Sequence, residues 1–408
     1  MSKTLKAVLL LSSVAVVAFI VIGGLRVSAA SNDGAYRQLG VFSEVLSRIR
    51  TEYVEEPNIP QVTDGALHGL LESLDANSSY LTPEEYKKLK ERQNEGKGNI
   101  GATISKRFGY AAVVSVLPGS AAAKSGVETG DIIEAIEGRS TREMSLAEIQ
   151  GLLAGQVGSN LNVSIVRARR AEPLKVTITR DLVKYPPASE KMLQENIGYI
   201  KVDALPKGES QQIAEKIKGA TSQGAKKLIL DLRDTSDGDM NEGIAAANLF
   251  LDHGTITYLQ GQKYPRETFT ADPKKAITTL PVVVLVNRGT GGPAEVVAAA
   301  LLENARADVV GDKTFGIGSI QKVINVPDGS ALILSIAKYY TPNGKAIQDT
   351  AVTPNITVAE NDDDFVLPDE DAPESTPEPE QKKVRTLEND QQLQRAIQVL
   401  QNKEKKAA

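Results

Sequence analysis

Residues 281–321 read PVVVLVNRGTGGPAEVVAAALLENARADVVGDKTFGIGSIQ, and this stretch is the most informative of the chain. The apolar run Val282–Val286 predicts a buried strand that ends in a glycine-rich turn. A helix follows, with Pro293 at its first position and Glu295 in its first turn. Enzymes often place a nucleophile at such a strand–turn–helix junction, because backbone N–H groups and the helix dipole favour negative charge there. This junction reads Gly-Gly-Pro instead of offering a serine or cysteine.

Strands and helices alternate on both sides of the junction. Further strand candidates are residues 197–202, 227–232, 308–311 and 331–337, and helix candidates are residues 210–222, 241–251 and 294–304. This alternation predicts an α/β layer with several buried strands. Residues 34–95 read as helical, and residues 389–402 as a short amphipathic helix.

Several longer motifs follow one another along nearly the whole chain. They are GALHGLLESLDANSSYLTPEEY at 65–86, VLPGSAAAKSGVETGDII at 116–133, LILDLR at 228–233, VVGDKTFG at 309–316 and YYTPNGKAIQ at 339–348. In this order the motifs resemble the C-terminal processing peptidases (tail-specific proteases), which are bacterial and plastid serine endopeptidases with a Ser/Lys dyad and a PDZ domain.

The resemblance implies an α/β fold, α+β overall, with a crotonase-like protease core, an inserted PDZ domain and an N-terminal helical segment. We expect six parts along the chain. They are a signal peptide or membrane anchor (1–30), a helical region (31–95), the PDZ domain (96–183), the peptidase-like core (190–358), an acidic disordered linker (359–386) and a C-terminal helix (387–408).

The chain departs from the family at the residues that would perform catalysis. Aligned without a gap, the family's nucleophilic serine falls on Gly292 and its lysine on Ile317, whereas the glutamine that assists the lysine is kept as Gln321. Glycine has no side chain to attack a carbonyl group, and isoleucine cannot accept a proton. Asp237 replaces a glycine of the oxyanion loop, where its carboxylate would repel developing negative charge. We therefore expect no catalytic residues of the family type.

One substitute pair of reactive residues is left open by the sequence. Thr290 could attack with Lys313 as its base, or Thr290 completes the turn and Lys313 lies on a solvated loop. Ser319 has no lysine at the family spacing.

The PDZ-like region implies a peptide-binding site. PDZ domains bind C-termini by strand addition, with loop N–H groups holding the carboxylate and an apolar pocket holding the last side chain. The predicted loop consists of Gly98, Asn99, Ile100 and Gly101. Candidates for the groove are Ile100, Ala102, Ile104, Ile149 and Leu153. For the loop we expect peptide binding, whereas for the individual apolar side chains we expect a place in the domain core.

Composition excludes several kinds of site. The chain has no cysteine and only two histidines, His68 and His253. A disulfide, a thiol nucleophile and a Cys-based metal site are thereby excluded, and we expect neither a metal nor a cofactor. Basic residues form no concentrated patch with interleaved aromatics, so we expect no nucleic-acid partner.

Both ends of the chain carry distinctive segments. Lys3 and Lys6 precede 19 uncharged residues, Ala7–Leu25, which predicts an export signal or a retained anchor; the length of the run favours the anchor. Both alternatives place the remainder in the periplasm or at the extracytoplasmic face of the inner membrane. Residues 360–380 hold ten Asp and Glu residues and no Lys or Arg, against a net charge of −5 for the whole chain.

The sequence therefore favours an exported, catalytically inactive homologue of these peptidases that binds polypeptide C-termini as an adaptor, scaffold or regulator. Expected partners are C-termini or unfolded proteins, an active peptidase relative, and a second copy of the chain through the N-terminal helices. The alternative is an active serine endopeptidase that processes envelope proteins through a rearranged or partner-completed site. A third reading makes the glycine-rich turn an anion site at a helix N-terminus.

Overall fold

The computed structural model describes residues 33–94, 96–107, 109–168, 170, 172–359 and 389–407. The predicted signal or anchor segment and the acidic segment lie outside these residues. The chain divides into two compact units, Met1–Leu67 and His68–Ala408. No helix within the described residues is long and apolar enough to cross a membrane.

The first unit is helical where it is described. It contains α2 (Asp33–Glu52) and most of α3 (Ile59–Glu72), which continues across the boundary. Leu39, Phe42 and Val45 of α2 are 61%, 44% and 52% exposed. These three apolar side chains of α2 are thus open to solvent.

The central sheet of the second unit has six strands in the order β10-β11-β12-β15-β16-β19. All neighbours are parallel except β10 and β11. The strands are β10 (Ser189–Leu193), β11 (Ile197–Lys201), β12 (Lys227–Asp231), β15 (Val282–Val286), β16 (Ala307–Gly311) and β19 (Ile356–Thr357). The apolar run Val282–Val286 is therefore an interior strand, buried at every position.

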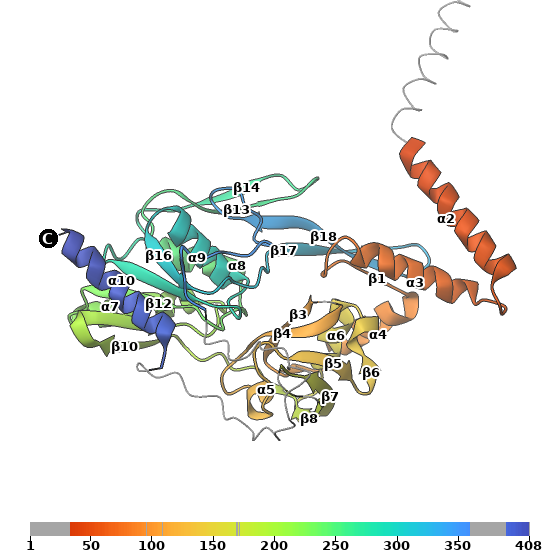
Figure 1. Cartoon of the computed structure of the whole chain (residues 1–408), viewed down its shortest axis with the longest axis horizontal. Helices are drawn as coiled ribbons and strands as arrows, with labels where there is room; N and C mark the ends of the chain where they lie inside the picture. The colour runs from red at the N-terminus through yellow and green to blue at the C-terminus, as the bar shows by residue number, and fades with distance from the viewer. Residues whose placement is uncertain are drawn as a thin grey trace, which may run out of the picture. The chain divides into compact units, whose positions relative to one another are not determined.

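The two faces of this sheet pack against different helices (Figure 1). Alternate residues of a strand point to opposite faces, so Val282, Val284 and Val286 join one core and Val283 and Leu285 another. The first core includes α7 (Glu209–Ser222), α8 (Met240–Asn248) and α9 (Pro293–Glu303). The second core is closed by the C-terminal helix α10 (Gln391–Ala407).

A second sheet packs on the helical layer. Its main path is β1-β18-β13-β14, with β17 paired to β18. These strands are β1 (Ser79–Leu81), β13 (Thr255–Gln260), β14 (Glu267–Thr270), β17 (Ser319–Asn325) and β18 (Ala331–Tyr340). Ile256, Leu259, Ala337 and Tyr339 join the core that holds α7 to α9. Gln321 lies on β17, a strand exposed over most of its length.

The PDZ-like region is a sheet closed by one helix, α6 (Leu146–Leu153). The sheet order is β3-β4-β5-β7-β8, with β6 paired to β5 and a separate pair of β2 with β9. The strands are β2 (Gly98–Asn99), β3 (Ala102–Arg107), β4 (Tyr110–Val116), β5 (Ile132–Ile136), β6 (Arg139–Ser140), β7 (Asn160–Val166), β8 (Leu174–Thr179) and β9 (Asp181–Leu182). Shorter helices are α4 (Pro83–Asn94), which precedes this region, α5 (Ala121–Lys124), and the 3-10 turns η1 (Thr141–Glu143) and η2 (Gln194–Asn196).

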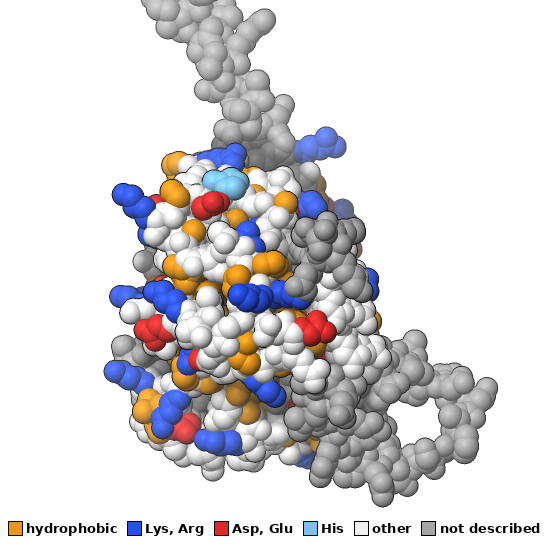
Figure 2. Space-filling view, turned by 90° about the vertical axis from the view of Figure 1, so that its left-hand side faces the viewer, with side chains coloured by type: hydrophobic (Ala, Val, Ile, Leu, Met, Phe, Trp, Pro, Cys, Tyr) orange, Lys and Arg blue, Asp and Glu red, His pale blue; other side chains and the backbone are white. Residues whose placement is uncertain are grey.

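Surface charge is dispersed on the face drawn in Figure 2. Among its described side chains, Lys and Arg are spread over this face between hydrophobic, acidic and uncharged groups.

Candidate active site and peptide-binding loop

Gly292 occupies the junction between β15 and α9 in a backbone conformation that side chains rarely adopt. Its φ is +55° and its ψ is −123°. A Cβ atom at this position would lie 3.0 Å from the carbonyl oxygen of Ser236. Enzymes with a nucleophile elbow hold the nucleophile on a sharp, strained turn of this kind between a strand and a helix. The chain keeps the strained turn and lacks the reactive side chain.

Glu295 fixes the turn to the segment that carries Ile317. Its carboxylate is fully buried and accepts backbone N–H groups from Gly292 (3.0 Å), Gly316 (2.8 Å) and Ile317 (2.8 Å), as well as the hydroxyl of Thr314. Burial raises the pKa of Glu295 to about 7, although these donors act in the opposite direction. The residue therefore joins the positions that correspond to the family's serine and lysine.

Ile317 packs directly on the turn. The Cδ1 atom of Ile317 lies 3.1 Å from the position that a Cβ atom on Gly291 would occupy, and the Cβ atom of Ser236 lies 2.9 Å from it. The residue at the predicted lysine position thus lies against Gly291, the neighbour of the predicted nucleophile position, and its apolar atoms fill the space there.

The turn leaves no backbone donor for an anion. Gly289 N–H donates to the Asn287 side chain, Thr290 N–H to Asn287 O and Gly291 N–H to Thr235 O. Gly292 N–H is bound to Glu295, and Pro293 has none. The anion-site reading of this turn is wrong, because an anion would find every N–H group already bonded.

Thr290 has the structural role that its turn predicts. Its side chain is fully buried, donates to Leu232 O at 2.8 Å and accepts from Asn287 N at 3.0 Å. The side chain of Lys313 is exposed. Both observations agree with a turn threonine and a solvated lysine.

Gln321 has polar partners on the second sheet. Its Nε2 atom donates to the Ser319 hydroxyl at 2.8 Å and to the Ser335 hydroxyl at 3.4 Å. The Ser335 hydroxyl donates to Asp75 at 3.1 Å. This cluster was not predicted, since it joins segments 260 residues apart.

The loop after β12 covers the turn from the other side. Asp234 accepts a hydrogen bond from the Asn287 side chain at 3.1 Å, and its Oδ1 atom lies 2.5 Å from where a Gly289 Cβ would be. The Ser236 hydroxyl lies 2.5 Å from the Ser115 hydroxyl of β4. Asp237 hydrogen-bonds Tyr185, whose pKa is raised to about 12 by burial and by this carboxylate. A carboxylate thus stands in the loop where the sequence predicted one.

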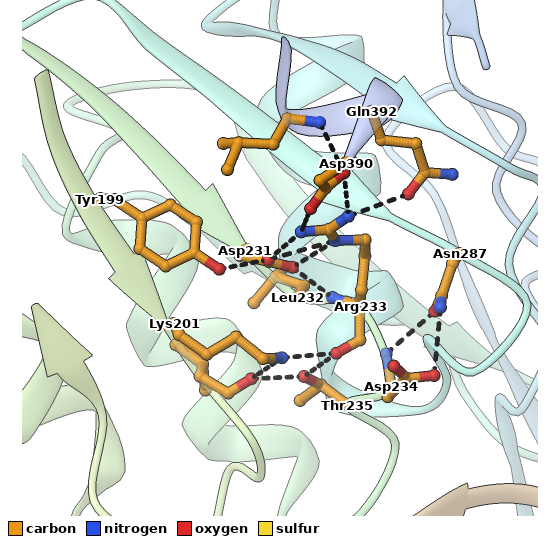
Figure 3. A network of polar contacts seen from close by, with 12 residues as sticks. Tyr199, Lys201, Asp231, Leu232, Arg233, Asp234, Thr235, Asn287, Asp390 and Gln392 are labelled. Carbon is orange, nitrogen blue, oxygen red and sulfur yellow. Dashed lines mark hydrogen bonds and ion pairs between the residues drawn. The ribbon is translucent and has the colours of Figure 1, made fainter. Parts of the chain in front are cut away.

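A buried polar network anchors the start of this loop (Figure 3). Arg233 donates to Asp231 at 2.6 Å and to Asp390 at 2.9 Å, and all three side chains are buried. Burial opposes ionisation of Asp231, but the charges of Arg233 and Lys201 outweigh it and hold the pKa of Asp231 below its usual range. Burial and the same carboxylate raise the pKa of Tyr199, which donates to Asp231 at 2.6 Å.

In the loop predicted to bind a peptide carboxylate, the Asn99 side chain already binds two of the backbone N–H groups. Asn99 Oδ1 accepts the N–H groups of Ile100 at 2.7 Å and Gly101 at 3.2 Å. Gly98 exchanges two backbone hydrogen bonds with Gly155, at 2.9 and 3.0 Å. An incoming carboxylate would have to displace the Asn99 amide to reach these donors. The sequence offered Asn99 only as a loop residue and did not indicate this contact.

The predicted groove residues lie mostly in the domain core. Ile100, Ile104, Ile149 and Leu153 are at most 5% exposed and belong to one hydrophobic cluster, and only Ala102 is partly exposed. These four side chains thus lie in the core between β3 and α6, the place expected for the individual apolar residues.

The described residues offer no metal centre. No group of three or more His, Asp or Glu side chains among them is arranged to hold an ion. His68 packs edge-on against Tyr80 with ring centroids 5.5 Å apart and lies 3.5 Å from Glu85.

Comparison with known proteins adds to this geometry. The model for peptidase family S41 matches residues 196–358, and a PDZ domain model matches residues 113–167. The carboxy-terminal-processing protease of Bartonella bacilliformis is 30% identical over 359 residues, which cover 86% of this chain and 82% of the relative. Carboxy-terminal processing protease CtpA of Bacillus subtilis is 30% identical over 331 residues, 81% of this chain and 70% of the relative.

A solved structure supports the same fold. The photosystem II D1 C-terminal processing protease aligns with a TM-score of 0.63 at 25% identity, over 78% of this chain and 92% of that protein. The predicted fold, an α/β peptidase core with a PDZ domain, is therefore confirmed.

Proposed function

This chain belongs to the family of carboxy-terminal processing proteases, and on that premise we propose that it is a member without peptidase activity that binds polypeptide C-termini through its PDZ domain. It acts on the extracytoplasmic side of the membrane as an adaptor, a scaffold or a regulator of an active relative.

The observation that carries this proposal is the pairing of Gly292 with Ile317. The two positions that need a nucleophile and a base are linked through Glu295, which accepts an N–H group from each, and they carry a hydrogen atom and an aliphatic side chain. Neither group can attack a carbonyl or move a proton. The backbone donors of Gly289 to Gly292 are also bonded within the chain, so this turn offers none to an oxyanion.

Peptide binding is supported by the surviving PDZ fold. The strand β3 pairs with β4 on one side only within its sheet, so its other edge is the place where an added peptide strand would hydrogen-bond. The loop Gly98–Gly101 leads into this strand, as peptide-carboxylate recognition requires.

The test uses the full chain with fluorescent peptides that end in an apolar residue. We expect micromolar binding that depends on a free terminal carboxylate, and no cleavage product by mass spectrometry. Binding should be unchanged in Gly292→Ala once folding is verified. Turnover of a peptide by the repurified protein would contradict the proposal and favour an endopeptidase with a rearranged or partner-completed site.

A further inference from the structure

A small polar cavity lies beside the predicted peptide-binding loop. It has a volume of about 260 Å³, and its walls include Arg92 of α4, Arg180, Ser159 and Gly155. Small-molecule sites usually measure roughly 300–1,000 Å³. The cavity is therefore suited to a compact group rather than to a large cofactor.

Arg180 is held rigidly in the wall by neutral acceptors. Its guanidinium donates to Leu152 O (2.7 Å), Leu153 O (3.3 Å), Asn160 O (3.2 Å) and the Ser159 hydroxyl (2.9 Å). An arginine has five N–H donors, so one remains for a ligand. Burial lowers the pKa of Arg180, and the charge of Glu137 acts in the opposite direction.

Arg92 brings a second positive charge to the cavity. It is half-buried, and it makes no hydrogen bond or ion pair with the described residues. Three carboxylates stand with it around the neighbouring cavity, but each has another base: Glu84 pairs with Lys88, Glu85 with His68 and Glu148 with Arg139. Arg92 and Arg180 also repel each other, which contributes to the lowered pKa of Arg180.

The cavity shares a wall with the loop. Gly155 lines the cavity and exchanges two backbone hydrogen bonds with Gly98, the first residue of the loop. A Cβ atom on Gly155 would lie 3.2 Å from Arg180 Nε, so the absence of a side chain lets the guanidinium lie close to the backbone of Gly155. The loop's own N–H groups are meanwhile bonded to Asn99.

We propose that Arg92 and Arg180 form the primary contact for the terminal carboxylate of a polypeptide bound to the PDZ domain. This inference rests on the proposed function and specifies its chemistry. Two convergent guanidinium groups with free donors match a carboxylate in geometry and charge, and such charge-assisted contacts are the stronger kind of hydrogen bond. Once the Asn99 side chain moves aside, the N–H groups of the loop bind the peptide backbone that precedes the carboxylate.

The experiment compares one peptide as free acid and as C-terminal amide, by fluorescence anisotropy with the full chain. Arg92→Gln is the main variant, because Arg92 has no described partner and its loss should leave folding intact. Arg92→Lys keeps the positive charge but loses the planar guanidinium, which can bind a carboxylate through two N–H groups. The matched control is Lys87→Gln, which removes one positive charge from the same helix at a side chain that is 76% exposed.

In the wild type we expect the acid to bind more tightly than the amide. Arg92→Gln should weaken binding of the acid by about tenfold and leave binding of the amide unchanged. Arg92→Lys should fall between the two, and Lys87→Gln should match the wild type. Equal acid preference in Arg92→Gln and wild type would overturn the inference while leaving C-terminal binding intact; a wild type that binds neither peptide would overturn the proposed function as well.

A titration with inorganic phosphate alone distinguishes a site for free anions from a site for a peptide C-terminus. Stabilisation by phosphate that Arg92→Gln abolishes, together with an unchanged acid preference, would make the cavity a site for free anions and contradict the inference.

Discussion

Arg233 and Asp390 form a buried ion pair although 157 residues separate them in the sequence. Arg233 Nη1 lies 2.9 Å from Asp390 Oδ1, and Nη2 lies 2.8 Å from Oδ2. The same Asp390 Oδ1 atom accepts the N–H group of Leu393, so one carboxylate both caps α10 and holds Arg233. Arg233 begins the loop that covers the glycine-rich turn. The C-terminal helix is thereby tied to the candidate site.

Replacing Asp390 by alanine should loosen α10. The variant loses one partner of a buried ion pair and the cap of a helix, although Arg233 keeps its contact with Asp231. We therefore expect the docking of α10 on the core to weaken by about 3 kcal/mol. Hydrogen exchange of the amides of residues 393–400 would measure it. Glu91→Ala, which removes an exposed partner 3.9 Å from Lys87, should change stability by less than about 1 kcal/mol. Wild-type protection of α10 in the Asp390 variant would refute this role.

Glu295 should make the stability of the core depend on pH. Its pKa rises from 4.5 to about 7 on folding, because the carboxylate is buried. Between these two values the folded chain retains a proton that the unfolded chain has lost, so the free energy of unfolding falls as pH rises. Relative to Glu295→Gln, the wild type should lose up to about 3 kcal/mol between pH 4.5 and 7, and little beyond.

Urea unfolding of both proteins at several pH values checks this expectation. The difference between them cancels the other titrating groups. Glu91→Gln, an exposed replacement with the same loss of charge, should show no such trend. A difference that is flat or that rises with pH would mean that the four donors keep Glu295 ionised throughout.

A side chain at position 292 should destabilise the turn. Gly292 has a φ of +55° and the carbonyl oxygen of Ser236 3.0 Å from the Cβ position, so Gly292→Ala should cost about 2 kcal/mol from strain and contact together. Gly119 has a φ of +74° with nothing within 4 Å, and Gly119→Ala isolates the strain. Denaturant unfolding should rank Gly292→Ala as the more damaging. The reverse order would show that the turn has room for a nucleophile.

Removing the Asn99 amide should strengthen peptide binding. Asn99→Ala frees the N–H groups of Ile100 and Gly101 for the ligand, and a net gain of about 1 kcal/mol corresponds to roughly fivefold tighter binding of free-acid peptides. Asn160→Ala, which removes a hydrogen bond to Thr179 on an exposed strand pair, serves as the control. Weaker acid binding in Asn99→Ala would indicate that Asn99 itself holds the ligand.

Local patterns predicted the elements but not the contacts between distant segments. Val282–Val286 and Pro293 mark a strand and a helix by apolar run and helix-start chemistry, and both elements are present. The role of Glu295 depends on donors about 20 residues away, and that of Asp390 on Arg233, which no local pattern encodes. For Ile149 the sequence could not decide between two roles, because an isoleucine in the core and one in a binding groove occur in the same local pattern.

The central claim is that Gly292 and Ile317 leave this chain able to bind polypeptides but not to cut them. The most direct measurement incubates the full chain with a fluorescently labelled unfolded protein and follows anisotropy and substrate mass in the same sample. We predict a rise in anisotropy with a substrate that stays at full length. Cleavage that survives repurification and disappears in Thr290→Ala would contradict the account, because a different nucleophile would then be at work.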